Sequence, residues 1–218
     1  MAQLGIQLYT VRDACETDFT GTLQSLARMG YTGFEFAWNY GGMDPEALTA
    51  FLKELGVQAA GFHTSLEEIA NPDSATYQYA RATGGTYLTT SLAGEVAKDW
   101  KATIGEVAKA AAVAKAQGFV FTYHNHAQEF EQIDGIYALD LLYQQTDPDA
   151  VKAELDTFWI KTGGADPVEY IKKYAGRVPQ VHVKDMDAQT KSFTEVGSGI
   201  LDWDAIFAAA REAGAEWM

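Results

Sequence analysis

The sequence predicts an α/β fold, a (β/α)₈ barrel that lacks most of its eighth strand–helix unit. Short apolar runs rich in β-branched and aromatic residues alternate strictly with longer segments of helical periodicity, and this alternation predicts a parallel sheet. The 218 residues hold seven such units and the start of an eighth strand, whereas complete barrels have about 250 residues. No glycine-rich phosphate turn follows the first apolar run, which disfavours a doubly wound dinucleotide-binding fold.

Each strand is assigned to a short apolar run, because β-branched and aromatic side chains favour extended backbone. In chain order, the expected strands cover residues 4–9, 34–38, 57–63, 86–91, 119–126, 151–156 and 178–184. Residues 216–218 are the expected beginning of the eighth strand. No linker or low-complexity segment interrupts the alternation, so we predict a single domain over residues 1–218.

The helices are assigned to segments with helical periodicity, and most have recognisable ends. Three are expected to end at Gly30, Gly56 and Gly118, and two begin with an Asp–Pro pair, at 44–45 and 166–167. Aspartate caps the first free backbone N–H groups of a helix, and proline fits its first turn. In chain order, the expected helices cover residues 19–29, 44–56, 73–81, 99–117, 137–145, a segment from 166 onward, and 202–213.

Composition excludes several classes of partner. The net charge is −14 and the pI is near 4.6, and binding to nucleic acid or to an anionic membrane surface needs clustered Lys and Arg instead. No run of about 18 apolar residues is available to span a membrane. The first residues do not resemble a signal peptide, and the one cysteine, Cys15, cannot form an internal disulfide. We therefore expect a cytoplasmic protein. Formation of a homo-oligomer is a further expectation, because the unpaired edge strands of an incomplete barrel can pair with another chain.

All four histidines lie near the carboxyl ends of expected strands. They are His63, His124, His126 and His182. Carboxylates occupy similar positions: Glu35, Glu154, Asp156 and Asp185. In a parallel barrel these strand ends form the face on which active sites are built. A lone histidine at a strand end is often only a hydrogen-bonded structural residue, but four at one rim favour a common site.

Strand alternation predicts which of these side chains share a face. Side chains two residues apart point the same way, so His124, Asp156 and His182 converge if their faces line the mouth of the barrel. Mixed imidazole and carboxylate ligands suit Zn²⁺, Mn²⁺ or Fe²⁺ better than Mg²⁺ or Ca²⁺. A divalent metal ion, Mn, Zn, Fe or Mg, is therefore the expected cofactor.

Four sequence motifs, in this order, resemble those of the xylose isomerase-like TIM barrels known as sugar phosphate isomerases/epimerases. They are FTYHNHAQEF at 121–130, ELDTFW at 154–159, VHVKDM at 181–186 and EVGSGILDW at 195–203. The resemblance extends over nearly the whole chain. The superfamily includes sugar isomerases and epimerases, inosose dehydratases, 3-keto-glycoside lyases and DNA-repair endonucleases.

The resemblance implies a set of metal ligands. It makes Asp156 and His182 ligands, whereas His124 stands where relatives usually have a glutamate. Either His124 replaces that ligand, or Glu129, just past the strand, reaches back to the metal. The last usual ligand is a glutamate on the eighth strand, which would lie beyond Met218. These differences leave the exact reaction open.

The chemistry shared by such enzymes is removal of a proton from a carbon next to a carbonyl. A histidine suits the role of base because its pKa lies near neutrality, so His124 or His126 is the candidate base. Glu154 is the candidate second acid/base, and Lys184 is a candidate donor to a substrate oxygen.

The remaining candidates would bind the small sugar substrate. His63 would donate to a substrate oxygen, and Glu35 lies at the same rim. Tyr9, Trp38 and Trp159 are candidate walls for a sugar ring, although packing at the rim would explain each of them equally well.

The leading hypothesis is a metal-dependent isomerase or epimerase acting on a carbohydrate or cyclitol. A lyase or dehydratase of the same superfamily is the alternative. A Schiff-base aldolase using Lys184 and a non-catalytic sugar-binding subunit are further candidates. DNA repair fits least, because the chain is acidic and has few histidines.

Overall fold

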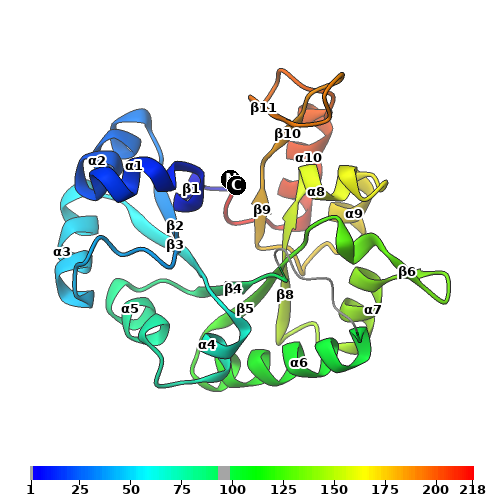
Figure 1. The fold of residues 1–218 in the computed structure, drawn as a ribbon, viewed down its shortest axis with the longest axis horizontal. Helices are drawn as coiled ribbons and strands as arrows, with labels where there is room; N and C mark the ends of the chain where they lie inside the picture. The colour runs from blue at the N-terminus through cyan, green and yellow to red at the C-terminus, as the bar shows by residue number, and fades with distance from the viewer. Residues whose placement is uncertain (1, 93–98) are drawn as a thin grey trace.

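The centre of the molecule is a sheet of seven parallel strands. The computed structural model describes residues 2–92 and 99–218. In sheet order the strands are β1 (Gly5–Gln7), β2 (Gly33–Ala37), β3 (Gln58–His63), β4 (Tyr87–Thr90), β5 (Val120–His124), β8 (Val151–Asp156) and β9 (Gln180–His182). The sheet curves, and helices surround its outer side (Figure 1). This is the predicted TIM barrel fold, with seven strands in its described sheet.

Helices follow the strands and supply the outer layer. The longer ones are α2 (Phe19–Met29), α3 (Pro45–Leu55), α5 (Ala75–Thr83), α6 (Trp100–Ala116), α7 (Ala138–Gln145) and α10 (Trp203–Ala213). The shorter ones are η1 (Leu8–Val11), α1 (Arg12–Thr17), α4 (Leu66–Ala70), η2 (Gln128–Phe130), α8 (Thr157–Thr162) and α9 (Pro167–Lys173). Across the described ranges, none combines the length and apolarity that crossing a bilayer requires.

The helix ends follow the signals in the sequence. Asp44 accepts a hydrogen bond from Ala47 N at 2.8 Å, and Asp166 accepts one from Glu169 N at 3.1 Å. Gly30 and Gly56 end their helices with φ of 103° and 69°, a backbone conformation that costs glycine little. These local signals were sufficient to place α2, α3 and the start of α9.

Several strands are shorter than predicted, and two of the differences concern site residues. β5 ends at His124 and β9 ends at His182, so His126 and Lys184 lie in the loops beyond them. The alternation rule therefore does not decide the directions of these two side chains. Two small hairpins were also not predicted: β6 (Gln132–Ile133) with β7 (Ile136–Tyr137), and β10 (Asp185–Met186) with β11 (Phe193–Thr194).

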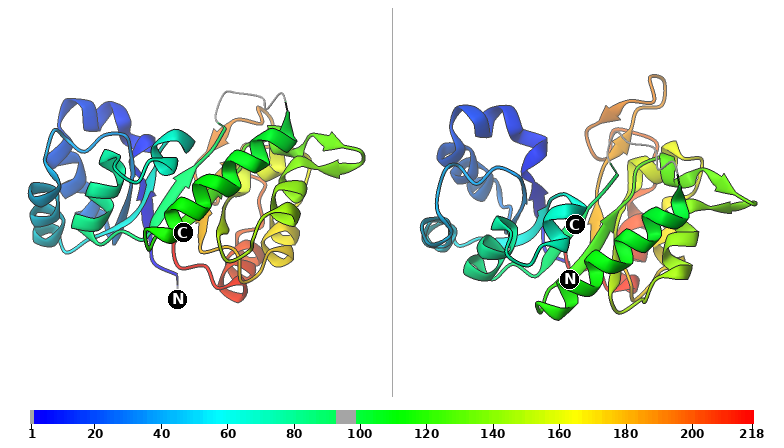
Figure 2. Two further views of the ribbon diagram at one scale, coloured as in Figure 1. Left: turned by 90° about the horizontal axis from the view of Figure 1, so that it is seen from below. Right: turned by 60° about the horizontal axis from the view of Figure 1, so that its bottom comes forward.

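The last residues of the chain close the sheet at one end. Trp217 forms parallel bridges with both Gln3 and Gln180, so it lies between β1 and β9, where an eighth strand begins. Gln3 N donates to Glu216 O at 2.7 Å, and Val181 N donates to Trp217 O at 3.1 Å. The two termini consequently lie side by side (Figure 2). Towards the carboxyl ends of the strands, β1 and β9 are not paired with each other.

Candidate metal and proton-transfer site

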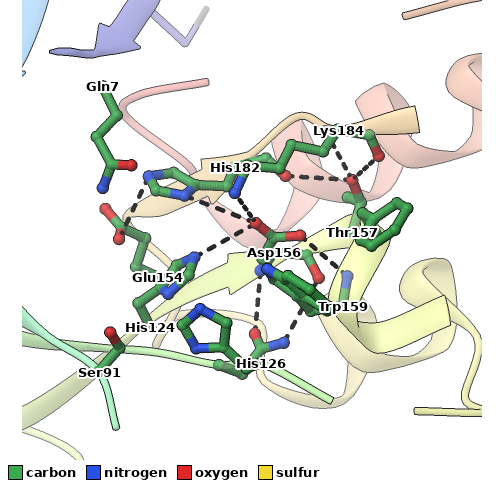
Figure 3. A network of polar contacts seen from close by, with 12 residues as sticks. Gln7, Ser91, His124, His126, Glu154, Asp156, Thr157, Trp159, His182 and Lys184 are labelled. Carbon is green, nitrogen blue, oxygen red and sulfur yellow. Dashed lines mark hydrogen bonds and ion pairs between the residues drawn. The ribbon is translucent and has the colours of Figure 1, made fainter. Parts of the chain in front are cut away.

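Five strands bring their polar side chains together at their carboxyl ends. His63, His124, Asp156 and His182 are the last residues of β3, β5, β8 and β9, and Glu35 and Glu154 lie two residues before the ends of β2 and β8. The register aligns these positions, because His124 pairs with Glu154 and Asp156 pairs with His182. Figure 3 shows these β5, β8 and β9 side chains pointing toward one another. The predicted convergence of His124, Asp156 and His182 is thus present in the structure.

Glu154 lies at the centre of the group. Its side chain is fully buried, and neither carboxylate oxygen has a hydrogen-bond partner among the described residues. Imidazole nitrogens stand nearby: His182 Nε2 is 3.3 Å from Oε2, and His63 Nδ1 is 3.8 Å from it. A buried carboxylate without hydrogen bonds is costly unless a cation or a proton compensates it.

Glu35 connects the two sides of the barrel mouth. One oxygen accepts a hydrogen bond from Gln7 Nε2 at 2.9 Å and lies 3.2 Å from His63 Nδ1. The other lies 2.8 Å from His182 Nε2. Since Glu35 belongs to β2 and His182 to β9, this contact crosses the side on which the sheet is open.

Asp156 is the most fully engaged carboxylate of the site. Its Oδ2 lies 2.7 Å from Lys184 Nζ, 3.3 Å from His124 Nε2 and 3.7 Å from His182 Nδ1. Its Oδ1 accepts a hydrogen bond from Trp159 N at 3.0 Å, which caps α8. These contacts fix the position of Asp156 and hold the Lys184 ammonium at the mouth.

The carboxyl groups of the site have very different pKa values. Burial raises the pKa of Glu154 well above its usual range, and the neighbouring charge of Glu35 adds to this. Burial would also raise the pKa of Glu35, but the charge and hydrogen bond of His182 lower it well below normal. The pKa of Asp156 is lowered well below normal against its burial, chiefly by His124 and His182. Glu154 is thus the carboxyl group that most readily holds a proton.

The imidazoles also differ. Burial lowers the pKa of His124 well below its usual value, and it lowers the pKa of His126 to about 4. Burial acts the same way on His182, but the charges of Glu154 and Glu35 outweigh it and raise the pKa to about 10. At neutral pH, His124 and His126 are therefore neutral, with lone pairs available to bind a proton or a cation.

The donor atoms fit a divalent cation. Within residues 2–92 and 99–218, two groups of three residues have ligand atoms within 4.8 Å of one another: His124, Glu154 and His182, and Glu35, His63 and Glu154. Both include the Glu154 carboxylate that lacks hydrogen bonds, and the buried Nδ1 atoms of His124 and His182 also lack them among the described residues. Mixed nitrogen and oxygen donors are typical of sites for Zn²⁺, Mn²⁺ and Fe²⁺.

Glu129 does not join this group. Its Oε1 accepts a hydrogen bond from the Tyr123 hydroxyl at 2.8 Å, and its Oε2 accepts one from His126 N at 2.8 Å. Tyr123 precedes His124 on β5, so its side chain points to the opposite face of the strand. The expectation that Glu129 reaches back to a metal therefore finds no support in the geometry.

A row of rings borders the site. The Trp38 ring centroid is 5.7 Å from that of His63, which is 5.3 Å from that of His124. His126 follows at 4.8 Å from His124, and Trp159 lies 5.2 Å from His126. The predicted walls Trp38 and Trp159 thus end the row on opposite sides.

Tyr9 is not part of this row. It is half exposed, and the guanidinium of Arg12 lies 4.5 Å above its ring. Two polar residues at the site were not predicted: Gln7, which binds Glu35 and lies 3.0 Å from His63 Nδ1, and Ser91, whose Oγ is 3.1 Å from His63 Nε2. Gln7 ends β1 and Ser91 follows β4, but neither is a histidine, an acid or an aromatic residue, so the sequence gives no signal for either.

Comparison with known proteins agrees with this geometry. The family model described as "Xylose isomerase-like TIM barrel" matches residues 23–218. The chain belongs to this family. The resemblance found in the four sequence motifs is thereby confirmed.

Individual members of the xylose isomerase-like family are only distantly similar. The chain is 26% identical to the inosose dehydratase of Geobacillus kaustophilus, over 85% of this chain and 73% of the relative. It is 30% identical to an inosose dehydratase of Clostridium perfringens, over 50% of this chain and 42% of the relative. The matched part of this chain spans less than half the length of the Clostridium perfringens enzyme.

Two solved structures have the same fold. A sugar phosphate isomerase/epimerase from Parabacteroides distasonis superposes with a TM-score of 0.83 at 22% identity, covering 99% of this chain and 85% of that one. An L-ribulose 3-epimerase superposes with a TM-score of 0.71 at 22% identity, covering 99% of this chain and 79% of that one. These likenesses support the barrel assignment.

Proposed function

We propose that the protein is a divalent-metal-dependent enzyme that removes a proton from a carbon next to a carbonyl of a carbohydrate or cyclitol. Isomerisation or epimerisation is the expected outcome. The observation that carries the proposal is the environment of Glu154. This buried carboxylate has no hydrogen bonds among the described residues, and its Oε2 lies 3.3 Å from His182 Nε2 and 3.8 Å from His63 Nδ1, on opposite sides of the barrel mouth.

The cation has one role in this proposal. When bound by Glu154 and the surrounding imidazoles, a divalent cation supplies positive charge that stabilises negative charge on the substrate's carbonyl oxygen. The candidate ligands are His124, Glu154 and His182, with Glu35 and His63 on the other side of Glu154. Asp156 and His182, the ligands implied by the resemblance, lie 3.7 Å apart at the same centre.

His126 is the best-placed candidate base. It lies outside both groups of potential ligands, its Nδ1 makes no hydrogen bond among the described residues, and it is neutral at neutral pH. Its ring packs against Trp159 at the rim, where a substrate would enter. A neutral imidazole there can accept a proton from the substrate carbon.

Lys184 complements this base. Its ammonium is bound to Asp156 at 2.7 Å, and about a third of the side chain is exposed. Since an ammonium has three N–H groups, Lys184 can still donate to a substrate oxygen. The Lys184 ammonium would orient the substrate. It would also donate a proton to a substrate oxygen, either one that becomes negatively charged or one that departs as water.

Solvent exchange tests the proposal without knowledge of the natural substrate. D-ribulose, D-fructose and 2-keto-myo-inositol are incubated in D₂O with protein that has been treated with a chelator and reloaded with Mn²⁺, Zn²⁺ or Mg²⁺. NMR should detect deuterium at a carbon next to the carbonyl of at least one compound. Protein from which a chelator has removed the metal should lose this exchange, and His126→Ala should slow the exchange by about 10²-fold or more.

A control separates the base from general damage. Glu67→Gln changes an exposed residue of α4 and should leave the exchange rate intact. If no compound gains deuterium under any metal, or if His126→Ala exchanges at the normal rate, the proposed chemistry or the proposed base is wrong.

Dehydration is the second candidate, and the inosose dehydratases among the relatives favour it. It begins with the same proton removal and continues with loss of a hydroxyl group from the next carbon, for which Lys184 would supply a proton. The product then lacks one water and contains a new carbon–carbon double bond. Mass spectrometry and ultraviolet absorption of the 2-keto-myo-inositol reaction distinguish dehydration from epimerisation, because epimerisation changes neither the mass nor the ultraviolet absorption of the compound.

A further inference from the structure

The turn that follows β2 holds a tryptophan in an unusual backbone conformation. Trp38 has φ of 58°, in the left-handed region that side chains with a Cβ, and bulky ones above all, rarely adopt. Asn39 N donates a hydrogen bond to Ala37 O at 2.7 Å, across Trp38. A two-residue hydrogen bond around a residue with positive φ defines the strained form of the γ-turn.

The residues on both sides of Trp38 are firmly held. Ala37 is paired with His63 in the sheet. Tyr40 stacks on Tyr79 with ring centroids 3.8 Å apart, and the Tyr79 hydroxyl donates to Met43 O at 2.7 Å. With both sides held, the turn keeps Trp38 at positive φ, as strained residues persist only where surrounding contacts over-determine them.

Core packing does not compensate this strain. The Trp38 side chain is 57% exposed, and its ring contact within the site is edge-on to His63 at 5.7 Å. The indole is therefore largely exposed at the rim of the site, with its edge beside His63, whose other contacts include the Glu35 carboxylate. A flat apolar surface beside polar groups is the arrangement by which binding sites orient a ligand that has both apolar and polar faces.

We propose that Trp38 is a specificity-determining residue, a platform strained into place that selects a ring-closed polyol over an open-chain one. The C–H bonds of a cyclitol ring, or of a pyranoside ring with a ketone on a ring carbon, form a flat apolar face that can lie on the indole while the hydroxyl groups reach the polar cluster. An open-chain sugar has no such face. This inference rests on the proposed function, since it assumes that the site accepts a polyhydroxylated substrate.

Binding of two matched probes tests the platform. myo-Inositol and D-mannitol are uncharged and carry the same number of hydroxyl groups, but only myo-inositol is a ring. Titration calorimetry or ligand-observed NMR on the metal-loaded protein should show at least tenfold tighter binding of myo-inositol. Trp38→Ala and Trp38→Gly should reduce this preference to threefold or less, whereas Trp38→Phe should keep most of it.

Thermal unfolding of the same variants tests the strain. At ordinary positions alanine is more stable than glycine, but at positive φ the order reverses, because alanine keeps the Cβ that glycine lacks. Trp38→Gly should therefore unfold about 2–4 °C above Trp38→Ala. Lys191, exposed between β10 and β11, has φ of 56° and provides the matched control. Lys191→Gly should likewise unfold above Lys191→Ala, and both should keep the normal probe preference.

The outcomes separate this inference from the proposed function. Absence of a ring preference in the unaltered protein, or its survival in Trp38→Ala and Trp38→Gly, would overturn the platform. Trp38→Ala unfolding above Trp38→Gly would overturn the strained turn. Neither readout needs turnover, so failure of the deuterium exchange alone contradicts the proposed function and leaves the binding result to decide the platform.

Discussion

At the scale of single residues, Glu154 combines two properties that ordinary packing would not bring together. It is fully buried, and its oxygens make no hydrogen bond within the described part of the chain. Its raised pKa, caused by burial and by the charge of Glu35, indicates that without a cation it holds a proton more readily than Glu35 or Asp156. A cation would displace that proton, so metal binding and proton release are coupled at this residue.

Glu154→Gln tests this coupling. Glutamine copies the shape and neutrality of the protonated acid, so the free energy of unfolding of the metal-free protein should change by less than about 1 kcal/mol. The increase in Tm that Mn²⁺ or Zn²⁺ produces in the unaltered protein should disappear, since the central ligand is lost. Thermal unfolding with and without metal measures both, and Glu67→Gln should retain the full metal effect. An undiminished metal effect in Glu154→Gln would place the cation elsewhere.

Asp185 organises the loop that precedes α10. Its fully buried carboxylate accepts hydrogen bonds from Gly197 N and Gly199 N, both at 2.9 Å, and from Trp203 Nε1 at 2.8 Å. Burial would raise the pKa of Asp185, but the Trp203 indole and the backbone N–H groups outweigh it and lower the pKa. The GSG segment at 197–199 thus forms a turn around a carboxylate of its own chain.

This lowered pKa predicts a pH dependence of stability. Because the folded pKa lies below the unfolded one, near 3.9, the contribution of Asp185 is fully present above that value and is lost as the pH falls through the folded pKa. Asp185→Asn should cost about 2 kcal/mol at pH 7 and less under acid conditions. Urea unfolding at pH 7 and at pH 3 measures the difference. An equal cost at both pH values would show that the charge of Asp185 contributes nothing.

At the scale of elements, Trp217 fills the base of the barrel. Its side chain is 7% exposed and lies against two glycines of neighbouring strands. A Cβ at Gly33 of β2 would lie 2.3 Å from the Trp217 ring, and one at Gly5 of β1 would lie 3.3 Å from it. Small residues on β1 and β2 therefore make room for the indole that bridges the first and last strands.

Gly33→Ala should lower the free energy of unfolding by about 2 kcal/mol, because the added methyl group overpacks against this ring. The same change in a Trp217→Leu background should cost less than half as much, since the indole is then absent. Gly105→Ala is the control: a Cβ there meets no described atom within 4 Å, and alanine favours the interior of α6 by up to about 1 kcal/mol. Urea unfolding of the variants distinguishes overpacking from a general effect of replacing glycine.

At the scale of the whole molecule, the site connects the two ends of an incompletely closed sheet. β1 and β9 are joined near the termini through Trp217, and towards the site the 2.8 Å contact between Glu35 and His182 spans the open side. A cation bound at Glu154 would draw ligands from β2, β3, β5, β8 and β9 to one point. Metal binding should therefore stabilise the edge strands more than the middle of the sheet.

Hydrogen exchange tests this expectation. Adding Zn²⁺ or Mn²⁺ to metal-free protein at about 100 times Kd should stabilise it by about 2.7 kcal/mol. The slowing of amide exchange should be largest in peptides covering β1, β2 and β9, whose local opening the cation resists. Equal slowing throughout the chain would mean that the cation does not bridge the open side.

The motifs and periodicity of the sequence were sufficient for the class of fold and for the position of the site on it. Alternating apolar runs, aspartate caps and terminal glycines are local signals, because each depends on a few neighbouring side chains. Histidines and acids at strand ends predicted the face on which these side chains gather, since parallel strands all end on one side. Convergence of His124, Asp156 and His182 followed from this reasoning alone.

Tertiary structure decided which of these groups meet and in what state. Local pattern contains no information on distances between β2 and β9, so the contact of Glu35 with His182 and the burial of Glu154 among imidazoles could not be predicted. The local pattern likewise does not predict that Glu129 accepts a hydrogen bond from the Tyr123 hydroxyl or that Trp38 has a positive φ. Burial, charge and backbone strain depend on how distant segments surround a residue, and the folded chain alone determines that.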